Sequence, residues 1–242
     1  AGVSHDSLAK KNVNKTIEAN CLSLNYFLEA QMKRYFDKLI YISTGSVFQD
    51  IKQSKQKIYE TDKPSPNSIY SITKRLSEIL IETFFKKTFK KVSCLRVSWV
   101  YGPPLLTKKI VPQRGPLPYI VQKLFIEKKK KLKFKSGGDF AASFTHIDDV
   151  CEAISKMITL KNFAHPIYHF GSGKNYSNFD IGNIIKKLYP QKEIVFGKGA
   201  KPWSNDSVMR GPLSTKYKFS FLKSKITLRD GIVRYINQVS KK

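Results

Sequence analysis

A tyrosine, a lysine and a threonine have the side-chain types and the spacing that proton chemistry requires. Tyr70 and Lys74 are four residues apart near the start of an amphipathic segment, so on a helix they stack on one face. A phenol with an unperturbed pKa of about 10 is a weak base at neutral pH, but a nearby ammonium favours the phenolate. We therefore expect Tyr70 to act as acid and base, Lys74 to lower its pKa, and Thr44 to orient the reacting substrate oxygen.

Two elements must position these side chains. The segment 38–43 reads as a buried parallel strand, which places Thr44 just past the carboxyl end of a strand, where open α/β sheets bind ligands. An amphipathic helix begins at Tyr70, and a second buried strand covers 92–97. A lone Tyr-x-x-x-Lys pattern is common, and an exposed pair on an ordinary helix is the alternative, so the surrounding residues decide. The apolar positions expected to bury this helix are Leu76, Ile79, Leu80 and Phe84.

Four stretches around these residues carry a specific resemblance. They are 41–48, with the candidate threonine; 60–74, with the tyrosine and the lysine; 95–103, which ends in Tyr-Gly-Pro; and 144–150, with the run Phe-Thr-His-Ile-Asp-Asp-Val. Together they resemble the extended short-chain dehydrogenase/reductases, specifically the NAD-dependent epimerase/dehydratase family that modifies nucleotide sugars. The resemblance extends from residue 1 nearly to the end of the chain, and it favours the catalytic interpretation over the ordinary helix.

The resemblance implies an α/β fold, with a Rossmann-like doubly wound parallel sheet and a smaller mixed α/β C-terminal substrate domain. Residues 1–102 would form the C-terminal part of the NAD(P)-binding domain with the catalytic residues, and 103–242 mainly the substrate-binding domain, with 143–171 returning to the sheet. Family members carry a Gly-rich strand–turn–helix before the position of residue 1, and the Gly171–Gly173 turn lacks the third glycine of that fingerprint. We therefore expect an N-terminally incomplete chain, short of roughly 60 residues, that binds NAD weakly by itself.

The resemblance also implies which residues contact ligands. Asn20 would support the cofactor side of the site through a hydrogen bond, and a solvent-facing asparagine is the alternative. The implied cofactor is NAD or NADP, the implied substrate is a nucleotide sugar, and the full-length protein would form a homodimer. The implied cofactor contacts are Ala1, Gly2, Asn20, Ser43, Tyr70 and Lys74, and the implied substrate contacts are Ser46, Trp99 and Arg210.

Departures from the family pattern bear on the substrate and the reaction. Trp99 stands where many nucleotide-sugar epimerases have an asparagine, and some deoxysugar reductases carry a similar Ser-Trp-Val-Tyr-Gly run. Ala142 stands in place of an arginine that clamps the pyrophosphate, which leaves Arg210 as the candidate phosphate contact. Gly45 and Ser46 occupy the positions of the Asp-Glu pair that serves elimination in the 4,6-dehydratases. An epimerase or a reductase is therefore favoured over a dehydratase.

The formal net charge of +26 suggests nucleic-acid binding as a second interpretation. Seven of the 44 basic residues are arginines, the type that forks onto phosphates and base edges, and the lysines are dispersed apart from one run at 128–131. A lysine-rich proteome produces the same composition, so we expect no specific nucleic-acid binding. The alternative function is a non-catalytic subunit of the same fold that binds RNA or a large assembly through this charge.

Other features of the composition bound the class of protein. No apolar stretch approaches the about 18 residues of a membrane span, and the first residues lack the pattern of a signal peptide, so we expect neither feature here. Cys21, Cys94 and Cys151 are scattered without metal-ligand spacing, which is typical of reduced thiols in a cytoplasmic protein. His165 and His169 lie four residues apart without a third ligand, so we expect structural roles and assign no metal site.

Hydrophobic periodicity and capping residues predict further helices and strands. Helices are expected over 119–128 and 148–160, after the cap residue Asn178, and after the capping-box residue Thr227, and short strands at 132–135 and 193–196. A single long helix is expected over 11–31, with an apolar stripe formed by Val13, Ile17, Leu24, Phe27 and Leu28.

Overall fold

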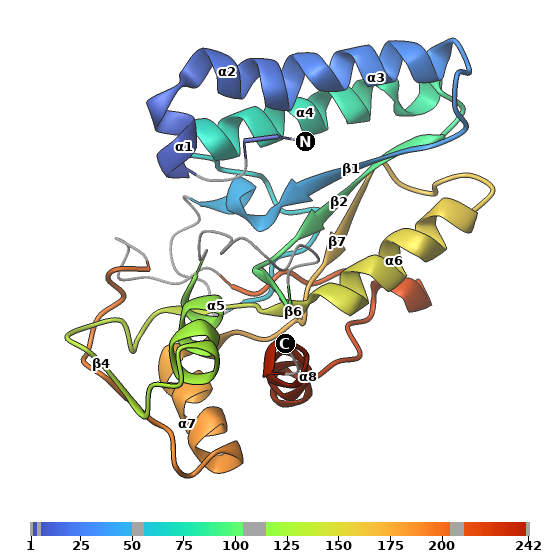
Figure 1. Ribbon diagram of the computed structural model, residues 1–242. Helices are drawn as coiled ribbons and strands as arrows, with labels where there is room; N and C mark the ends of the chain where they lie inside the picture. Colours follow the sequence, from blue (N-terminus) through green and yellow to red (C-terminus); the bar gives the residue numbers. More distant parts are fainter. Residues whose placement is uncertain (1, 4–5, 50–55, 104–114, 204–210, 241–242) are drawn as a thin grey trace.

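In the described part of the chain, three parallel strands form the sheet that carries the candidate residues (Figure 1). The order is β1 (Leu39–Thr44), β2 (Val92–Val97) and β7 (Ile167–Phe170), with Thr44 opposite Val97. Thr44 is the last residue of its strand, so it lies at the carboxyl edge of the sheet, where the sequence places it. The structure is a computed structural model, and it describes residues 2–3, 6–49, 56–103, 115–203 and 211–240.

Helices cover both faces of this sheet, which gives the doubly wound α/β arrangement that the sequence predicts (Figure 1). The long helix α4 (Ile69–Lys87) lies beside the N-terminal helices on one face, and α6 (Ile147–Thr159) lies on the other. Successive residues of β2 serve the two faces, because Cys94 belongs to the core under α4 and Leu95 to the core under α6. The N-terminal elements are α1 (Asp6–Lys11), α2 (Val13–Ile17), a π-helical turn (Glu18–Leu22) and α3 (Ser23–Met32).

The long N-terminal helix is divided, and its predicted apolar stripe is only partly buried. Leu24 and Leu28 are buried as expected, whereas Val13, Ile17 and Phe27 are 38%, 39% and 55% exposed. The π-helical turn offers a physical reason, because its wider hydrogen-bonding pattern rotates the residues before it relative to those after it. A stripe drawn with one uniform helical period therefore joins side chains that do not share a face.

Helix α4 begins where expected because a reciprocal cap fixes its first turn. The Ser68 hydroxyl accepts the Ser71 N–H at 3.2 Å, and the Ser71 hydroxyl accepts the Ser68 N–H at 3.0 Å. The predicted buried face is partly wrong, since Leu76 and Ile79 are 47% and 43% exposed. Polar side chains with partners on neighbouring elements occupy much of the buried face, which consists of Ser71, Thr73, Ser77, Glu78, Ile81 and Phe85.

Strand β1 is parallel, as predicted, but it is not a fully buried strand. Ser43 is 2% exposed, whereas Ile42 is 37% exposed and the other residues are half-buried. Strand β2 is buried almost throughout. Within the described residues β1 pairs only with β2, whereas β2 has a neighbour on each side, and this edge position explains the difference.

A second lobe has a core of its own and lies below the carboxyl edge of the sheet in Figure 1. Its first helix begins at Pro116, earlier than predicted, because proline suits the first helical position. The cap expected at Asn178 is formed by Ser177, whose hydroxyl accepts the Asp180 N–H at 3.1 Å in a capping box. The helices are α5 (Pro116–Val121), continued by a π-helical turn (Gln122–Ile126), α7 (Asn178–Leu188) and α8 (Leu228–Ser240).

Among the described residues, three pairs of short strands lie outside the three-stranded sheet. The strands predicted at 132–135 and 193–196 are present and pair with each other in parallel. Helix α6 matches the prediction over 148–160 to within a residue, and Thr227 caps α8 by accepting the Asp230 N–H at 3.1 Å. No helix in the described ranges has the length and apolar character needed to cross a membrane. The strand pairs are β3 (Val100–Tyr101) with β6 (Thr145–His146), β4 (Lys131–Phe134) with β9 (Glu193–Phe196), and β5 (Ala141–Ala142) with β8 (Tyr176–Ser177).

Candidate active site

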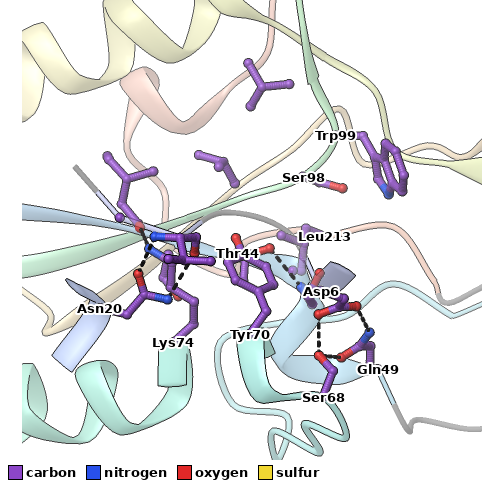
Figure 2. A pocket seen from close by; sticks show the side chains of 18 of the residues that line it. Asp6, Asn20, Thr44, Gln49, Ser68, Tyr70, Lys74, Ser98, Trp99 and Leu213 are labelled. Carbon is purple, nitrogen blue, oxygen red and sulfur yellow. Dashed lines mark hydrogen bonds between the residues drawn. The ribbon is translucent and has the colours of Figure 1, made fainter. Parts of the chain in front are cut away.

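A cavity of about 1290 Å³ opens at the carboxyl edge of the sheet, and Thr44, Tyr70 and Lys74 all line it. Pockets for a single drug-sized ligand measure about 300–1,000 Å³, so this cavity has room for more than one such group. Figure 2 shows Tyr70 and Lys74 rising from the start of α4, with Asn20 on one side and Ser98 and Trp99 on the other. The structure therefore brings together the three residues whose spacing suggests proton chemistry.

Thr44 is held by the turn that follows its strand. Its hydroxyl oxygen accepts the Ser46 N–H at 3.1 Å, which caps the 3-10 turn Gly45–Phe48. An accepting hydroxyl keeps its own proton, so Thr44 can donate a hydrogen bond to a ligand oxygen in the cavity. Ser46, an expected substrate contact, lines the same wall.

The Lys74 ammonium is anchored to β1 at two adjacent residues. It donates to the Ile42 carbonyl at 2.8 Å and lies 4.4 Å from the centre of the Tyr41 ring. Burial lowers the pKa of Lys74, with opposing effects from Cys94 and Glu78. An ammonium has three N–H donors, so the side chain can bind a ligand hydroxyl while it keeps its contact with the carbonyl.

Asn20 has the hydrogen-bonding role that the sequence suggested, and the solvent-facing alternative is wrong. Asn20 is 2% exposed; its side-chain oxygen accepts the Val3 N–H at 2.9 Å, and its amide donates to the Val3 carbonyl at 3.0 Å and to Thr73 at 3.1 Å. A Cβ on Gly2 would come within 2.8 Å of the Asn20 oxygen, so this close approach requires glycine. Asn20 thus fixes the segment Gly2–Val3 as part of the cavity wall.

Ser43 is expected from the resemblance to contact the cofactor, but its hydroxyl is turned into the protein. It donates to Glu78 Oε1 at 2.6 Å, and the residue is 2% exposed. The physical reason is the alternation of a strand, which sends neighbouring side chains to opposite faces. The Ser43 hydroxyl therefore makes an internal contact with α4, while the residue itself still forms part of the cavity wall.

The side of the cavity around Trp99, an expected substrate contact, is aromatic. Trp99 lines it and packs edge-on against Phe140, with ring centroids 5.1 Å apart. Gly115, with a φ of +98°, lies so close to the indole that a Cβ would approach it to 2.8 Å. Two of the expected contacts, Ala1 and Arg210, fall outside the described residues.

The two spaced histidines have structural contacts in the interior. His169 is fully buried; its Nε2 lies 3.0 Å from an Arg96 nitrogen, and its Nδ1 lies 3.0 Å from the Ser214 carbonyl. His165 stacks on the Tyr217 ring at 3.7 Å. Within the described ranges no group of three or more His, Cys, Asp and Glu side chains could hold a metal ion.

Sequence reasoning missed a polar cluster at the entrance to α4. The Ser68 hydroxyl donates to Asp6 at 2.6 Å, and the Gln49 amide donates to the same carboxylate at 3.1 Å (Figure 2). The Ser-x-x-Ser spacing of residues 68–71 was a visible signal for the cap. No local pattern indicates Asp6, because the Ser68 partner lies 62 positions further along the chain.

Replacing Ser68 should measurably loosen the start of α4. Ser68→Ala removes the cap and the hydrogen bond to Asp6, and we expect it to lower the free energy of unfolding by about 1 kcal/mol. Thr227→Ala is the matched control, because it removes the cap of α8 away from the cavity. Urea unfolding measures both losses. In the protein from its complete reading frame, the affinity for the cofactor that the resemblance implies should fall only in Ser68→Ala, and equal affinity in the two variants would contradict a role for the cap at the site.

Comparisons with known proteins identify the family. The model of the "NAD dependent epimerase/dehydratase family" matches residues 1–171. The chain belongs to this family. The resemblance inferred from the motifs is thereby confirmed, and an enzyme family is favoured over the alternative of a non-catalytic binding subunit.

Relatives and solved structures agree with this family and fold. The chain is 25% identical over 194 residues to the dTDP-D-glucose 4,6-dehydratase of Dictyostelium discoideum. The matched region covers 76% of the chain and 43% of that protein. It is 26% identical over 227 residues to the UDP-glucuronate 4-epimerase of Thermodesulfobacterium geofontis, which covers 91% and 65%. The structure of the Thermus thermophilus UDP-glucose 4-epimerase complex with NAD has the same fold, with a TM-score of 0.75, 18% identity, and coverage of 100% of this chain and 76% of that one. The chain thus spans about half to two thirds of these curated relatives.

Proposed function

We propose that the protein is an NAD(P)-dependent nucleotide-sugar epimerase or reductase. The observation that carries this proposal is the convergence of Thr44, Tyr70 and Lys74 on one cavity at the carboxyl edge of the sheet. If the Tyr-Lys pair belonged to an ordinary exposed helix, we would expect both side chains to face solvent. Instead both line a cavity that is also lined by the Thr44 hydroxyl at the end of a neighbouring strand. Membership of an NAD-dependent family and relatives named for nucleotide sugars support the same conclusion.

The roles follow from the chemistry of each group. Tyr70 gives or takes the proton of the reacting sugar oxygen, at the position in the cavity where Thr44 can donate a hydrogen bond to that oxygen. The Lys74 ammonium favours the phenolate form of Tyr70, which a tyrosine needs if it is to accept a proton near neutral pH. Because the Ile42 carbonyl holds this ammonium at 2.8 Å, its position does not depend on the substrate.

The described residues that line the cavity fit the nicotinamide ribose of a nicotinamide dinucleotide. Lys74 would donate to its ribose hydroxyls, and the segment Gly2–Val3, fixed by Asn20, would form part of the wall beside it. The bound cofactor supplies the hydride acceptor and donor. The protein contributes the placement of the two ligands in one cavity and the movement of a proton at the Tyr70 oxygen.

The residues that follow Thr44 favour epimerisation or reduction over dehydration. A dehydratase needs an acid and a base for the elimination step, and carboxylates commonly supply these groups. Gly45 and Ser46 stand at those positions, and Gly45 packs against Leu213, with which a Cβ would be in contact at 3.2 Å. Leu213 also lines the cavity, so this part of the wall is apolar instead of acidic.

Product analysis distinguishes the reactions. The protein expressed from its complete reading frame would be incubated with UDP- and dTDP-sugars, each with NAD, NADH, NADP or NADPH, and the products followed by proton NMR. We expect interconversion at a sugar carbon or reduction of a keto sugar. A 4-keto-6-deoxy product would contradict the proposal against dehydration, and cofactor binding without turnover of any nucleotide sugar would contradict the proposed substrate class.

A further inference from the structure

A buried ion pair lies one helical turn beyond Lys74 on α4. Glu78 on α4 and Arg96 on β2 are 0% and 1% exposed. Their contact is bidentate, because Arg96 Nε donates to Glu78 Oε1 at 2.8 Å and Arg96 Nη2 donates to Oε2 at 2.7 Å. The same carboxylate accepts the Ser43 hydroxyl at 2.6 Å and an Arg75 N–H at 3.2 Å. Every lone-pair region of Glu78 is thus directed to a fixed donor.

This ion pair joins the catalytic helix to the catalytic strand. Tyr70, Lys74 and Glu78 follow one another at intervals of four residues, so they lie along one side of α4. Lys74 is bound to the Ile42 carbonyl and Glu78 to the Ser43 hydroxyl, which are consecutive residues of β1. Two attachments one helical turn apart fix both the rotation and the height of α4 beside the strand that ends in Thr44.

The Arg96 nitrogen that does not contact Glu78 leads through His169 to the segment 213–214, in which Leu213 forms part of the cavity wall. Arg96 Nη1 lies 3.0 Å from His169 Nε2, and His169 Nδ1 lies 3.0 Å from the Ser214 carbonyl. Ser214 follows Leu213, which lines the cavity next to Gly45. A continuous chain of polar contacts therefore runs from the catalytic helix through Arg96 and His169 to the residue after Leu213, which lines the cavity beside Gly45.

We propose that Glu78 is a positioning residue that holds Lys74, and through it Tyr70, in the geometry and charge state that catalysis requires; this inference rests on the proposed function of the site. Stability alone is a poor reason for such a pair, because buried ion pairs can often be exchanged for apolar residues without loss of stability. The contacts with Ser43 and Arg96 serve placement instead. Glu78 touches neither substrate nor cofactor and acts through Lys74.

The electrostatic part of this role concerns the Lys74 ammonium. Burial lowers the pKa of Lys74, while Cys94 and Glu78 oppose that shift. Burial also raises the pKa of the Cys94 thiol well above its ordinary range, so that thiol is neutral near pH 7. Glu78 is the carboxylate among these neighbours and is paired with the Arg96 guanidinium, so its replacement should leave the desolvation of Lys74 less opposed.

The direct test is the pKa of Lys74, which needs neither substrate nor turnover. The protein from its complete reading frame would be labelled with carbon-13 at the lysine Cε position, and the Lys74 signal assigned by its absence in Lys74→Arg. We expect Glu78→Gln to lower the pKa of Lys74 by about one unit. Glu82→Gln is the matched control, because it removes a carboxylate from the same helix that is 38% exposed and pairs with Arg75. It should leave the Lys74 signal unchanged.

Glu78→Gln leaves Arg96 buried without its counter-ion, which could prevent folding. A second variant keeps the test decisive in that case. The double variant Glu78→Gln with Arg96→Met removes both charges at similar volume and should fold. It should show a lowered pKa of Lys74, by less than in Glu78→Gln because the positive charge of Arg96 is removed as well. When assayed with the nucleotide sugar that the wild type converts, it should show a lower kcat with little change in KM. The alkaline limb of its kcat profile should move to lower pH, because the ammonium is lost earlier.

Two results would overturn the proposal. A folded double variant with the wild-type pKa of Lys74 and the wild-type kcat would show that the ion pair is structural only. Failure of both variants to fold would show that the pair is needed for the fold itself. If the pKa of Lys74 shifts as expected but no nucleotide sugar is converted by the wild type, the positioning role stands and the proposed function fails, so the two failures are distinguishable.

Discussion

Tyr70→Phe should leave the protein folded and able to bind its cofactor, yet reduce turnover about 10²–10⁴-fold, the usual loss for a positioned acid or base. The substitution removes one hydroxyl and keeps the ring that lines the cavity. The expected loss therefore appears in kcat, with little change in cofactor affinity measured by calorimetry. Tyr35→Phe is the matched control, because Tyr35 is 76% exposed and does not line the cavity.

Lys74→Met should lose cofactor affinity as well as turnover. One ammonium is proposed to donate to the cofactor and to stabilise the phenolate, so its removal affects both measurements, whereas Tyr70→Phe affects one. The contacts to the Ile42 carbonyl and the Tyr41 ring disappear with it. A Tyr70→Phe protein with undiminished turnover, or a Lys74→Met protein with unchanged cofactor affinity, would contradict these roles.

Acidification should destabilise the protein through His169 before any carboxylate of ordinary pKa is protonated. Burial, followed by the charge of Arg96, lowers the pKa of His169 from 6.5 to about 4 in the folded state, while Glu60 partly opposes the shift. The unfolded chain therefore takes up this proton first as the pH falls. Stability is full above about pH 6.5 and is lost progressively towards pH 4, by up to about 3 kcal/mol for this group.

Urea unfolding between pH 7 and pH 4.5 measures this loss. His169→Gln is the informative variant, because a glutamine amide can accept from Arg96 and donate to the Ser214 carbonyl without titrating. Burial also lowers the pKa values of His146 and His165, so the variant should keep part of the dependence and lose the rest. Equal slopes in the wild type and the variant would contradict a neutral, buried His169.

The sequence was sufficient to predict the strand–helix–strand unit that carries the site. Lys74 follows Tyr70 by one helical repeat, so the two side chains share a helix face, and Thr44 ends an apolar run, which places it at the end of a strand. The family resemblance of the surrounding stretches indicates that these side chains meet in one site. Asn20 could also be proposed as a buried hydrogen-bonding residue. In these cases the positions in sequence determine the positions in space through the period of a helix or the end of a strand.

The buried face of α4 could not be predicted in the same way. Leu76 and Ile79 are apolar yet exposed, while Ser77 and Glu78 are polar yet buried. Hydrophobic periodicity assumes that the apolar face packs inward, and it fails where polar side chains find partners far along the chain. Ser77 donates to the Asn20 carbonyl, 57 positions away. Only the tertiary structure shows that such partners exist.

The central claim is that this cavity performs hydride transfer with Tyr70 as the proton-transferring group. Stopped-flow absorbance in the band of reduced nicotinamide measures it most directly, after the NAD complex of the full-length protein is mixed with the nucleotide sugar that it converts. For an epimerase we predict transient formation of reduced nicotinamide in the wild type, and for a reductase the same signal on mixing with the reduced sugar product. In Tyr70→Phe we predict that reduced nicotinamide forms less than a hundredth as fast. Loss of an acid/base group typically lowers a rate by about 10²–10⁴-fold. Conversion of the sugar without any change in nicotinamide absorbance, or an equal rate in Tyr70→Phe, would contradict the account.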